Sequence, residues 1–491
     1  MASTAISTSA VSKTASGMMR PCASAAVAAV AAASAAAGAA TGATELSGPT
    51  ADPVGPGREA EESTGPGGLP EGVAVTSLAG GVRVVTEAVP SVRSVALGLW
   101  TRTGSRDEGP GQEGLSHFLE HLLFKGTERF SAIEISERFD GMGAAANAAT
   151  SKESTHVHAR FLDEHLEDVF DLMAEMMLGP TFPDIDSERE VVLEEIAMYE
   201  DEPSDRVHDF LAEAVYGAHP LGRRVLGEAD VIASIPVPKI AEYHRNRYVS
   251  DNLVVAAAGH VDHDRVVELA ERLVRPPEGV TAPANGGAPD TGPRVRFHRK
   301  DTEQYHICFG APGIARADER RFALSVADSA FGGSVSSRLF REVREKRGLA
   351  YSIGSYSEQY VDNGSVAMYV GTREDNVGEA CEIIARELAA IRDGGIRGEE
   401  LARAKEHVKG RMVLSAESSA SRMSRLARAM LFDLEVLSLD ETLARVDAVS
   451  EDDVAALASE LYNPAAFSAA CIGRDESCFV KGAGAVSEAL T

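Results

Sequence analysis

The pattern of hydrophobic and polar positions predicts a strand-first arrangement of elements in the first half of the chain. Short β-branched segments with partial alternation are typical of strands, and longer segments with apolar residues every three to four positions are typical of helices. The expected strands cover residues 82–86, 95–103, 147–161 and 252–259, and the expected helices cover residues 114–125, 131–142, 166–178 and 186–216.

The second half repeats this order of elements with little residue identity. Expected strands cover residues 294–297, 305–311, 352–357 and 365–370, and expected helices cover residues 318–330, 377–392 and 419–432. A Gly/Ser turn at residues 332–334 leads into residues 337–346. Two strand-first halves of similar length indicate an α+β fold that arose by duplication. We expect a first domain over residues 72–274 and a second over residues 294–480, joined by a Pro/Gly-rich linker over residues 275–293.

The first 70 residues differ in composition from both halves. Residues 1–44 contain no Asp or Glu, and Lys13 and Arg20 are their only basic residues. This segment has too few strongly apolar residues for a membrane span, so we interpret residues 1–70 as a disordered low-complexity extension or a targeting segment.

Charge and cysteine usage limit the partners and the compartment. The 491 residues carry 75 acidic and 48 basic side chains, a formal charge of −27. Such a surface repels nucleic acid and anionic membranes, so we expect neither as a partner. Five scattered cysteines without a CxxC pair indicate a reducing compartment. We therefore expect a cytoplasmic protein, or a mitochondrial or exported one if residues 1–44 are a targeting segment.

The strongest chemical signal is the segment His117-Phe118-Leu119-Glu120-His121. Positions i and i+4 share one face of a helix, so His117 and His121 can bind one metal ion. The order is HxxEH, the inverse of the common zinc-peptidase motif. A catalytic zinc takes three protein ligands and leaves a position for water, and Glu120 could accept the proton of that water.

The third ligand must come from elsewhere in the chain, and residues 187–199 are the best candidate. Glu188 and Glu195 are seven positions apart and share one helical face, whereas Glu194 points elsewhere. Taken alone, this segment is more typical of an ordinary acidic surface helix.

These motifs together resemble those of the pitrilysin/insulinase family of zinc metallopeptidases. The closer match is the small-subunit branch, with the bacterial processing-peptidase-like proteases and the mitochondrial processing peptidase β subunit. That pattern has HxxEH and, some seventy-odd residues later, a glutamate in an E-R-x-V context; here 73 residues separate His121 from Glu195. The resemblance implies His117, His121 and Glu195 as ligands of one Zn²⁺ per chain and Glu120 as general base.

The resemblance also implies roles for residues outside the metal-binding motif. Glu188 matches an acidic residue that supports the ligands, and Asn147-Ala148 matches a strand that binds substrate beside the metal. In the second half, Arg344 and Tyr351 match an element thought to hold the substrate backbone and the developing oxyanion. The implied fold has two homologous domains of the LuxS/metallohydrolase-like type, each a mainly antiparallel sheet backed by helices.

Three weaker signals are more typical of structural residues. His156 and His158 share one strand face, where a second metal site competes with ordinary packing or surface exposure as the explanation. His260 and His263 follow a strand end and fit a solvated turn. Cys308 lies in an apolar strand and fits a small core residue.

The sequence therefore predicts a zinc-dependent metalloendopeptidase that acts on peptides or unfolded protein segments. The alternatives are a non-catalytic partner or core subunit of the same fold and an organellar processing peptidase. Because the zinc ligands fall in the first half and Arg344 and Tyr351 in the second, we expect a homodimer with composite sites.

Overall fold

The computed structural model describes residues 68–183, 185–275 and 287–491. The expected extension over residues 1–70 therefore lies outside the described residues except at its end, and so does most of the expected linker. The domain boundaries drawn from the sequence stay a prediction. No helix in the described ranges is long and apolar enough to cross a membrane.

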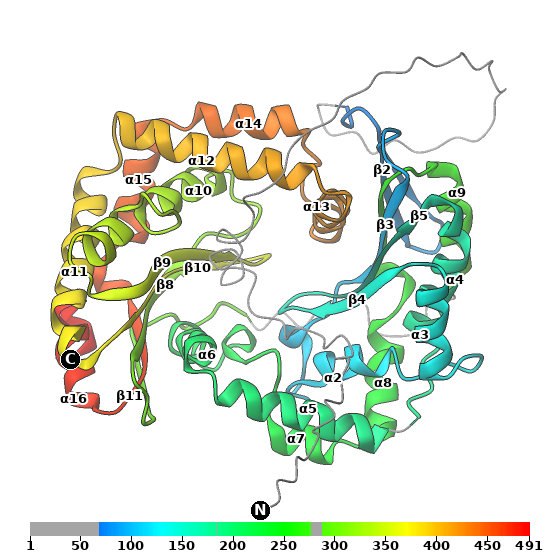
Figure 1. The fold of residues 1–491 in the computed structure, drawn as a ribbon, viewed down its shortest axis with the longest axis horizontal. Coiled ribbons are helices and arrows are strands. Elements are labelled where there is room, and N and C mark those ends of the chain that lie inside the picture. The colour runs from blue at the N-terminus through cyan, green and yellow to red at the C-terminus, as the bar shows by residue number, and fades with distance from the viewer. Residues whose placement is uncertain (1–67, 184, 276–286) are drawn as a thin grey trace, which may run out of the picture. The chain divides into compact units, whose positions relative to one another are not determined.

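The first half forms a six-stranded sheet in the order β1-β2-β6-β3-β5-β4 (Figure 1). All neighbouring strands are antiparallel except β2 and β6. The strands are β1 (Val73–Ser77), β2 (Arg83–Ala88), β3 (Ser94–Thr101), β4 (Ala145–Thr150), β5 (Thr155–Leu162) and β6 (Leu253–Gly259).

The second half forms a five-stranded sheet in the order β7-β11-β8-β10-β9, in which only β7 and β11 are parallel. Its strands are β7 (Val295–Arg299), β8 (Tyr305–Gly313), β9 (Ala350–Gln359), β10 (Gly364–Thr372) and β11 (Ser468–Gly473). Numbered within each half from β2 and from β7, both sheets have the order 1-5-2-4-3 with the parallel pair in the same place. The expected α+β fold with two similar, mainly antiparallel sheets is confirmed, and β1 is an addition to the first.

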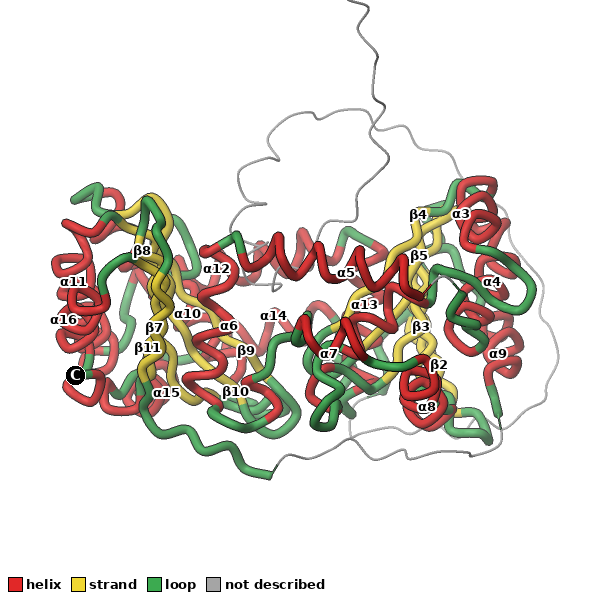
Figure 2. Tube along the Cα trace, turned by 90° about the horizontal axis from the view of Figure 1, so that it is seen from below, coloured by secondary structure: helices red, strands yellow, loops and turns green. Residues whose placement is uncertain are grey.

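Helices cover one face of each sheet and bury its apolar side chains (Figure 2). Leu97 of β3 and Val157 of β5 are fully buried against the first group of helices. That group consists of α2 (Leu115–Leu122), α3 (Ala132–Gly141), α4 (Leu166–Leu178), α5 (Ile185–Glu200), α7 (Ala229–Ser234), α8 (Val237–Arg247) and α9 (His263–Ala270). The second group consists of α10 (Arg321–Phe331), α11 (Val377–Gly394), α12 (Glu399–Ala416), α14 (Leu439–Ala448), α15 (Glu451–Leu461) and α16 (Glu476–Val486).

The two remaining helices are exchanged between the halves. Helix α6 (Pro203–Tyr216) belongs to the first half of the chain but packs on β8 and β11 of the second sheet. Helix α13 (Ser419–Leu431) belongs to the second half but packs on β2, β3 and β6 of the first sheet. Each exchanged helix lies on the sheet face opposite to that sheet's own helices, so the second face of each sheet is also covered where that helix packs.

Two expected elements are divided in the structure. The strand expected over residues 147–161 is the hairpin β4–β5, because Ser151 and Ser154 form a tight turn in which the Ser151 hydroxyl bonds the Ser154 carbonyl at 3.1 Å. The helix expected over residues 186–216 is α5 followed by α6, because Pro203 lacks the N–H that a continuous helix would use. The segment that follows the Gly/Ser turn contains a π-helical segment, Phe340–Glu345.

Candidate metal centre

Helix α2 carries the HxxEH segment and is held firmly at its N-terminus. Gly114 precedes the helix with φ of 92°, a left-handed conformation that favours glycine. Gly227 packs so closely on it that a Cβ at Gly227 would lie 2.2 Å from the Gly114 Cα. The Glu108 carboxylate accepts hydrogen bonds from the N–H groups of Gly114 at 2.8 Å and Ser116 at 2.7 Å. These bonds satisfy donors that a helix N-terminus leaves unpaired. They hold the helix in place at Ser116, the residue directly before His117.

Helix α5 packs against α2 and completes a cluster of three possible ligands. One donor atom each from His117, His121 and Glu195 lie within 4.8 Å of one another. The Oε2 atom of Glu195 is 3.3 Å from the Nε2 of His121 and 3.7 Å from the Nε2 of His117. Among the described residues this is the only such cluster of three or more His, Cys, Asp or Glu side chains.

The geometry and the donor set fit zinc. In a tetrahedral site with metal–ligand distances of about 2.0–2.2 Å, neighbouring donors lie about 3.3–3.6 Å apart. The Glu195–His121 and Glu195–His117 distances are close to these values. Two imidazoles and one carboxylate form a donor set used by catalytic zinc sites, which keep the fourth position for water.

Glu188 lies on the far side of His121 from Glu195. Its Oε1 atom is 2.8 Å from the Nδ1 of His121, and its Oε2 atom is 2.6 Å from the Nζ of Lys125. The Glu188 side chain is 6% exposed, so this contact is protected from water. A hydrogen bond to Nδ1 leaves the Nε2 of His121 free to act as the metal ligand. The neighbouring Glu194 is exposed, as its position on the helix predicts.

The environment also suits the two histidines to metal binding. Burial, together with the nearby His121, lowers the pKa of His117 to about 4, so this imidazole is neutral as a ligand must be. Burial alone would lower the pKa of His121, but its hydrogen bonds with Glu188 and Glu195 raise the pKa to about 9. The carboxylates that favour a proton on His121 also favour a metal cation beside it.

Glu120 is placed to take up a proton. Its Oε2 atom is buried and has no hydrogen-bond partner in the described structure. Burial raises the pKa of Glu120, although hydrogen bonding with Thr150 opposes this effect. A carboxylate with one unpaired oxygen beside the ligand cluster has the features of a general base.

Asn147 and Ala148 lie on β4, the edge strand of the first sheet, which packs against α2. The N–H of Ala148 donates to the side-chain oxygen of Asn147 at 2.9 Å. This N–H therefore points to the open edge of the sheet, where an added strand would bind.

Arg344 and Tyr351 lie together in the second half. The Arg344 guanidinium donates to the Tyr351 carbonyl at 2.7 Å and lies 4.5 Å from the centre of its ring. The Tyr351 side chain is 78% exposed. Within the described part of one chain, neither residue forms a hydrogen bond or ion pair with His117, His121 or Glu195.

The residues behind the weaker sequence signals at His260, His263 and Cys308 make ordinary structural contacts. His260 pairs closely with Asp163, and His263 bonds the hydroxyls of Thr76 and Thr86, each at 2.9 Å. Cys308 is fully buried, and burial raises its thiol pKa well above the usual value. None of these residues belongs to the ligand cluster.

Sequence reasoning missed three residues at the site: Glu108, Lys125 and Thr150. Lys125 follows His121 by four positions, one helical turn, and this spacing was an available signal. Nothing local marks Glu108 or Thr150, because their roles depend on a loop and a strand that fold against α2.

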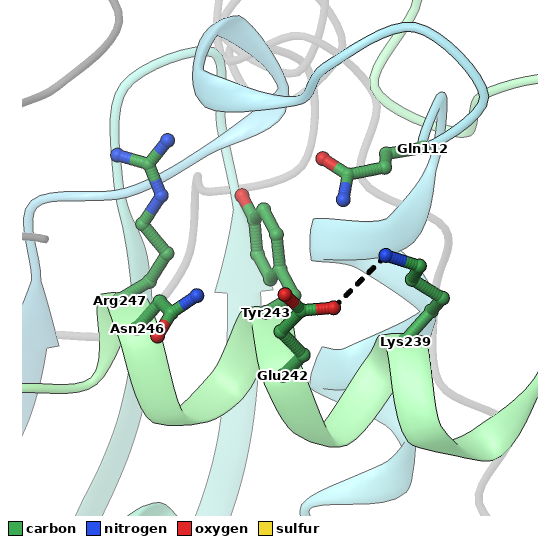
Figure 3. A pocket seen from close by; sticks show the side chains of 6 residues that line it. All are labelled: Gln112, Lys239, Glu242, Tyr243, Asn246 and Arg247. Carbon is green, nitrogen blue, oxygen red and sulfur yellow. Dashed lines mark hydrogen bonds and ion pairs between the residues drawn. The ribbon is translucent and has the colours of Figure 1, made fainter. Parts of the chain in front are cut away.

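A surface pocket lies behind α2, beside α8 (Figure 3). Its lining residues are Gln112, Lys239, Glu242, Tyr243, Asn246 and Arg247. At its base the Tyr243 hydroxyl bonds the Ser116 hydroxyl at 2.9 Å. The pocket contains none of the three candidate ligands.

Two family models match the chain. Residues 83–229 match the model described as Insulinase (Peptidase family M16), and residues 234–408 match the Peptidase M16 inactive domain.

Curated relatives are similar over most of their length. An uncharacterized zinc protease of Streptomyces coelicolor is 42% identical over 396 residues, which cover 79% of this chain and 86% of the relative. The uncharacterized zinc protease YmxG of Bacillus subtilis is 41% identical over 384 residues, covering 78% and 94%.

Solved structures share the fold. A peptidase M16 inactive domain from Pseudomonas fluorescens superposes with a TM-score of 0.77 at 22% identity, covering 82% of this chain and 98% of that one. A protease from Helicobacter pylori gives a TM-score of 0.75 at 23% identity, covering 82% and 100%.

Proposed function

Because the chain belongs to the insulinase family of peptidases, family M16, we propose that it is a zinc-dependent metalloendopeptidase acting on peptides or unfolded protein segments. The observation that carries this proposal is the juxtaposition of His117, His121 and Glu195 with the unpaired carboxylate oxygen of Glu120. The names of the relatives agree with it, since they are called zinc proteases.

Each residue at the site has a task in peptide hydrolysis. His117, His121 and Glu195 would hold one zinc ion, which when bound polarises the scissile carbonyl and acidifies a water molecule. Glu188 keeps the His121 ring oriented through its Nδ1 atom. Glu120 accepts the proton of the attacking water and passes it to the leaving amine.

The open edge of β4 supplies a path for the peptide. A peptide that adds to this edge as a further strand can accept a hydrogen bond from the Ala148 N–H, in place of the Asn147 side chain. At the end of β4, Thr150 hydrogen-bonds with Glu120, so a peptide aligned along the strand approaches the general base. Main-chain hydrogen bonding of this kind recognises extended segments whatever their exact sequence, which favours unfolded substrates.

Arg344 and Tyr351 complete the site from a second copy of the chain. Their mutual contact leaves the Tyr351 ring exposed and able to contact a bound peptide. We assign them to the site of the partner in a homodimer, in which each copy gives its metal centre to one site and its Arg344–Tyr351 pair to the other.

Metal analysis combined with peptide cleavage tests the proposed function. Purified protein should contain one zinc ion per chain and cleave an unstructured quenched peptide, with activity lost in chelator and restored by zinc. A zinc-loaded protein that cleaves no peptide in a diverse unstructured library would instead support the alternative of a non-catalytic partner subunit.

A further inference from the structure

One face of β5 is basic and only partly covered. His156, His158 and Arg160 alternate with the buried Val157 and Ala159, so they share the face opposite the first sheet's own helices. The register places Trp100, Gly98 and Ala96 of β3 beside them. Helix α13 packs on this face over β2, β3 and β6, and Figure 1 shows β4 at the end of the sheet beyond it. We call His156, His158 and Arg160 together the basic face.

The basic face lacks acidic partners. The His156 ring stacks on the Trp100 indole with ring centres 3.6 Å apart. The Nδ1 atoms of His156 and His158 are buried and have no hydrogen-bond partner in the described structure. Burial, followed by the nearby His158 and Arg428, holds the pKa of His156 well below its usual value, and no carboxylate opposes this shift.

Two arginines give this region its permanent charge. Arg160 is exposed and forms no ion pair within the described ranges. Arg428 of α13 acts electrostatically on His156, and in the described structure its side chain donates only to the Ser424 carbonyl of its own helix, at 3.2 Å. Burial lowers the pKa of His156 and of His158, so both imidazoles are neutral near pH 7. In a chain with a formal charge of −27, Arg160 and Arg428 therefore supply the positive charge of this region.

The basic face lies one strand away from the open edge of β4. Neighbouring strands are about 4.8 Å apart, so a peptide added to β4 lies about 9.6 Å from β5. The residues of β4 between them are Ala145 beside Arg160, Asn147 beside His158 and Ala149 beside His156. Two of these three side chains are methyl groups, which leave room for long side chains of the peptide and of β5 to meet above β4.

We propose that the basic face, together with Arg428, selects peptides with Asp or Glu at alternate positions on one side of the scissile bond. The exposed guanidinium groups of Arg160 and Arg428 would complement acidic side chains of a peptide added to the neighbouring edge of β4. This inference rests on the proposed peptidase function and on addition of the peptide to β4. The residues selected lie within about six positions of the scissile bond, because β4 spans six residues, Ala145–Thr150.

Three matched peptides test this proposal. They share one sequence and carry Glu, Gln or Lys at the alternate positions, and each is assayed for kcat/KM and for binding to the Glu120→Gln protein. Wild-type protein should favour Glu over Gln by about fivefold, the upper range for a solvent-accessible ion pair, and should favour Gln over Lys. Arg160→Glu should reverse this order, because it places a negative charge at the same position.

The control is Arg245→Glu, which makes the same change of charge at an exposed arginine on α8. It should keep the wild-type order, which separates a local effect from the change in net charge. Equal kcat/KM and equal binding for the three peptides would overturn this inference while leaving the peptidase proposal intact. Preference for Glu that survives unchanged in Arg160→Glu would also overturn it, whereas failure to cleave any peptide would count against the proposed function itself.

Discussion

The Oε1 atom of Glu188 lies 2.8 Å from the Nδ1 of His121, on the opposite side of the ring from Glu195. This contact joins Glu188, which lies outside the candidate ligand cluster, to His121, which belongs to it. A carboxylate partner of this kind fixes the tautomer and the orientation of the imidazole and makes it a stronger ligand.

The change Glu188→Gln should therefore weaken zinc binding by about 10- to 100-fold without loss of the fold. Competition with a chromogenic chelator measures the affinity. Glu194→Gln is a matched control on the same helix, since Glu194 is exposed, and it should leave the affinity unchanged. Equal affinities in the two variants would show that Glu188 has no role in metal retention.

Removal of a ligand should remove the metal. We expect purified His117→Ala and His121→Ala proteins to contain no stoichiometric zinc, because two protein ligands hold a catalytic zinc poorly. His260→Ala, which changes a histidine paired with Asp163 outside the site, should retain it. Metal content by mass spectrometry decides the point, and a full complement of zinc in His121→Ala would refute the ligand assignment.

Replacement of Glu120 should impair catalysis without impairing zinc binding. Glu120→Gln should keep zinc and the native fold but lose about 10²- to 10⁴-fold in kcat, because the amide cannot accept the proton of water. Near-native turnover by a zinc-loaded Glu120→Gln protein would mean that another group is the base.

The composite site can be tested by mixing two inactive dimers. Glu120→Gln and Tyr351→Phe homodimers should each be weak, whereas subunit exchange between them should regenerate one intact site in each mixed dimer. Activity should rise to part of the wild-type level after exchange. Mixed dimers as inactive as both parents would show that Tyr351 does not act on the partner's site.

Stability should depend on pH through Asp328, a residue far from the metal centre in sequence. Burial raises the pKa of Asp328 to about 6, although the Ser355 hydroxyl donates to its Oδ1 at 2.6 Å. The folded state therefore holds this proton more tightly than the unfolded state, and the carboxylate destabilises the fold as pH rises from about 4 through 6. Compared with Asp328→Asn, the wild-type protein should lose up to about 2 kcal/mol of unfolding free energy between pH 4 and pH 7.

Urea unfolding of both metal-free proteins across this pH range measures the difference. The asparagine keeps an acceptor for Ser355 but has no proton to release, so it is the matched reference. A difference in unfolding free energy that does not vary with pH would contradict the assignment.

Local patterns were sufficient for much of the fold and for the core of the site. The spacing of His117 and His121 on one helical face follows from helix geometry, and the strand order of the two halves agrees with a duplicated unit. The hairpin at Ser151–Ser154 was missed because alternation continues on both sides of the turn. Glu108 could not be found from the sequence, because its role depends on a loop that returns to the start of α2.

The same limit applies to helix α6. Its amphipathic pattern predicts that it is buried, but not that its partner is a sheet built almost a hundred residues later in the chain. Periodicity identifies which face of a helix is apolar, and only the tertiary structure identifies what covers that face.

The exchange of α6 and α13 makes the two halves interdependent. Without the other half, each sheet would expose an apolar face to water, where Val85 and Trp100 now contact α13, and Cys308 and Ile472 contact α6. We therefore expect the halves to unfold in one cooperative transition, and either half expressed alone to aggregate. The second half supplies none of the proposed metal ligands, yet mutations in it should thus abolish the proposed zinc binding by global unfolding.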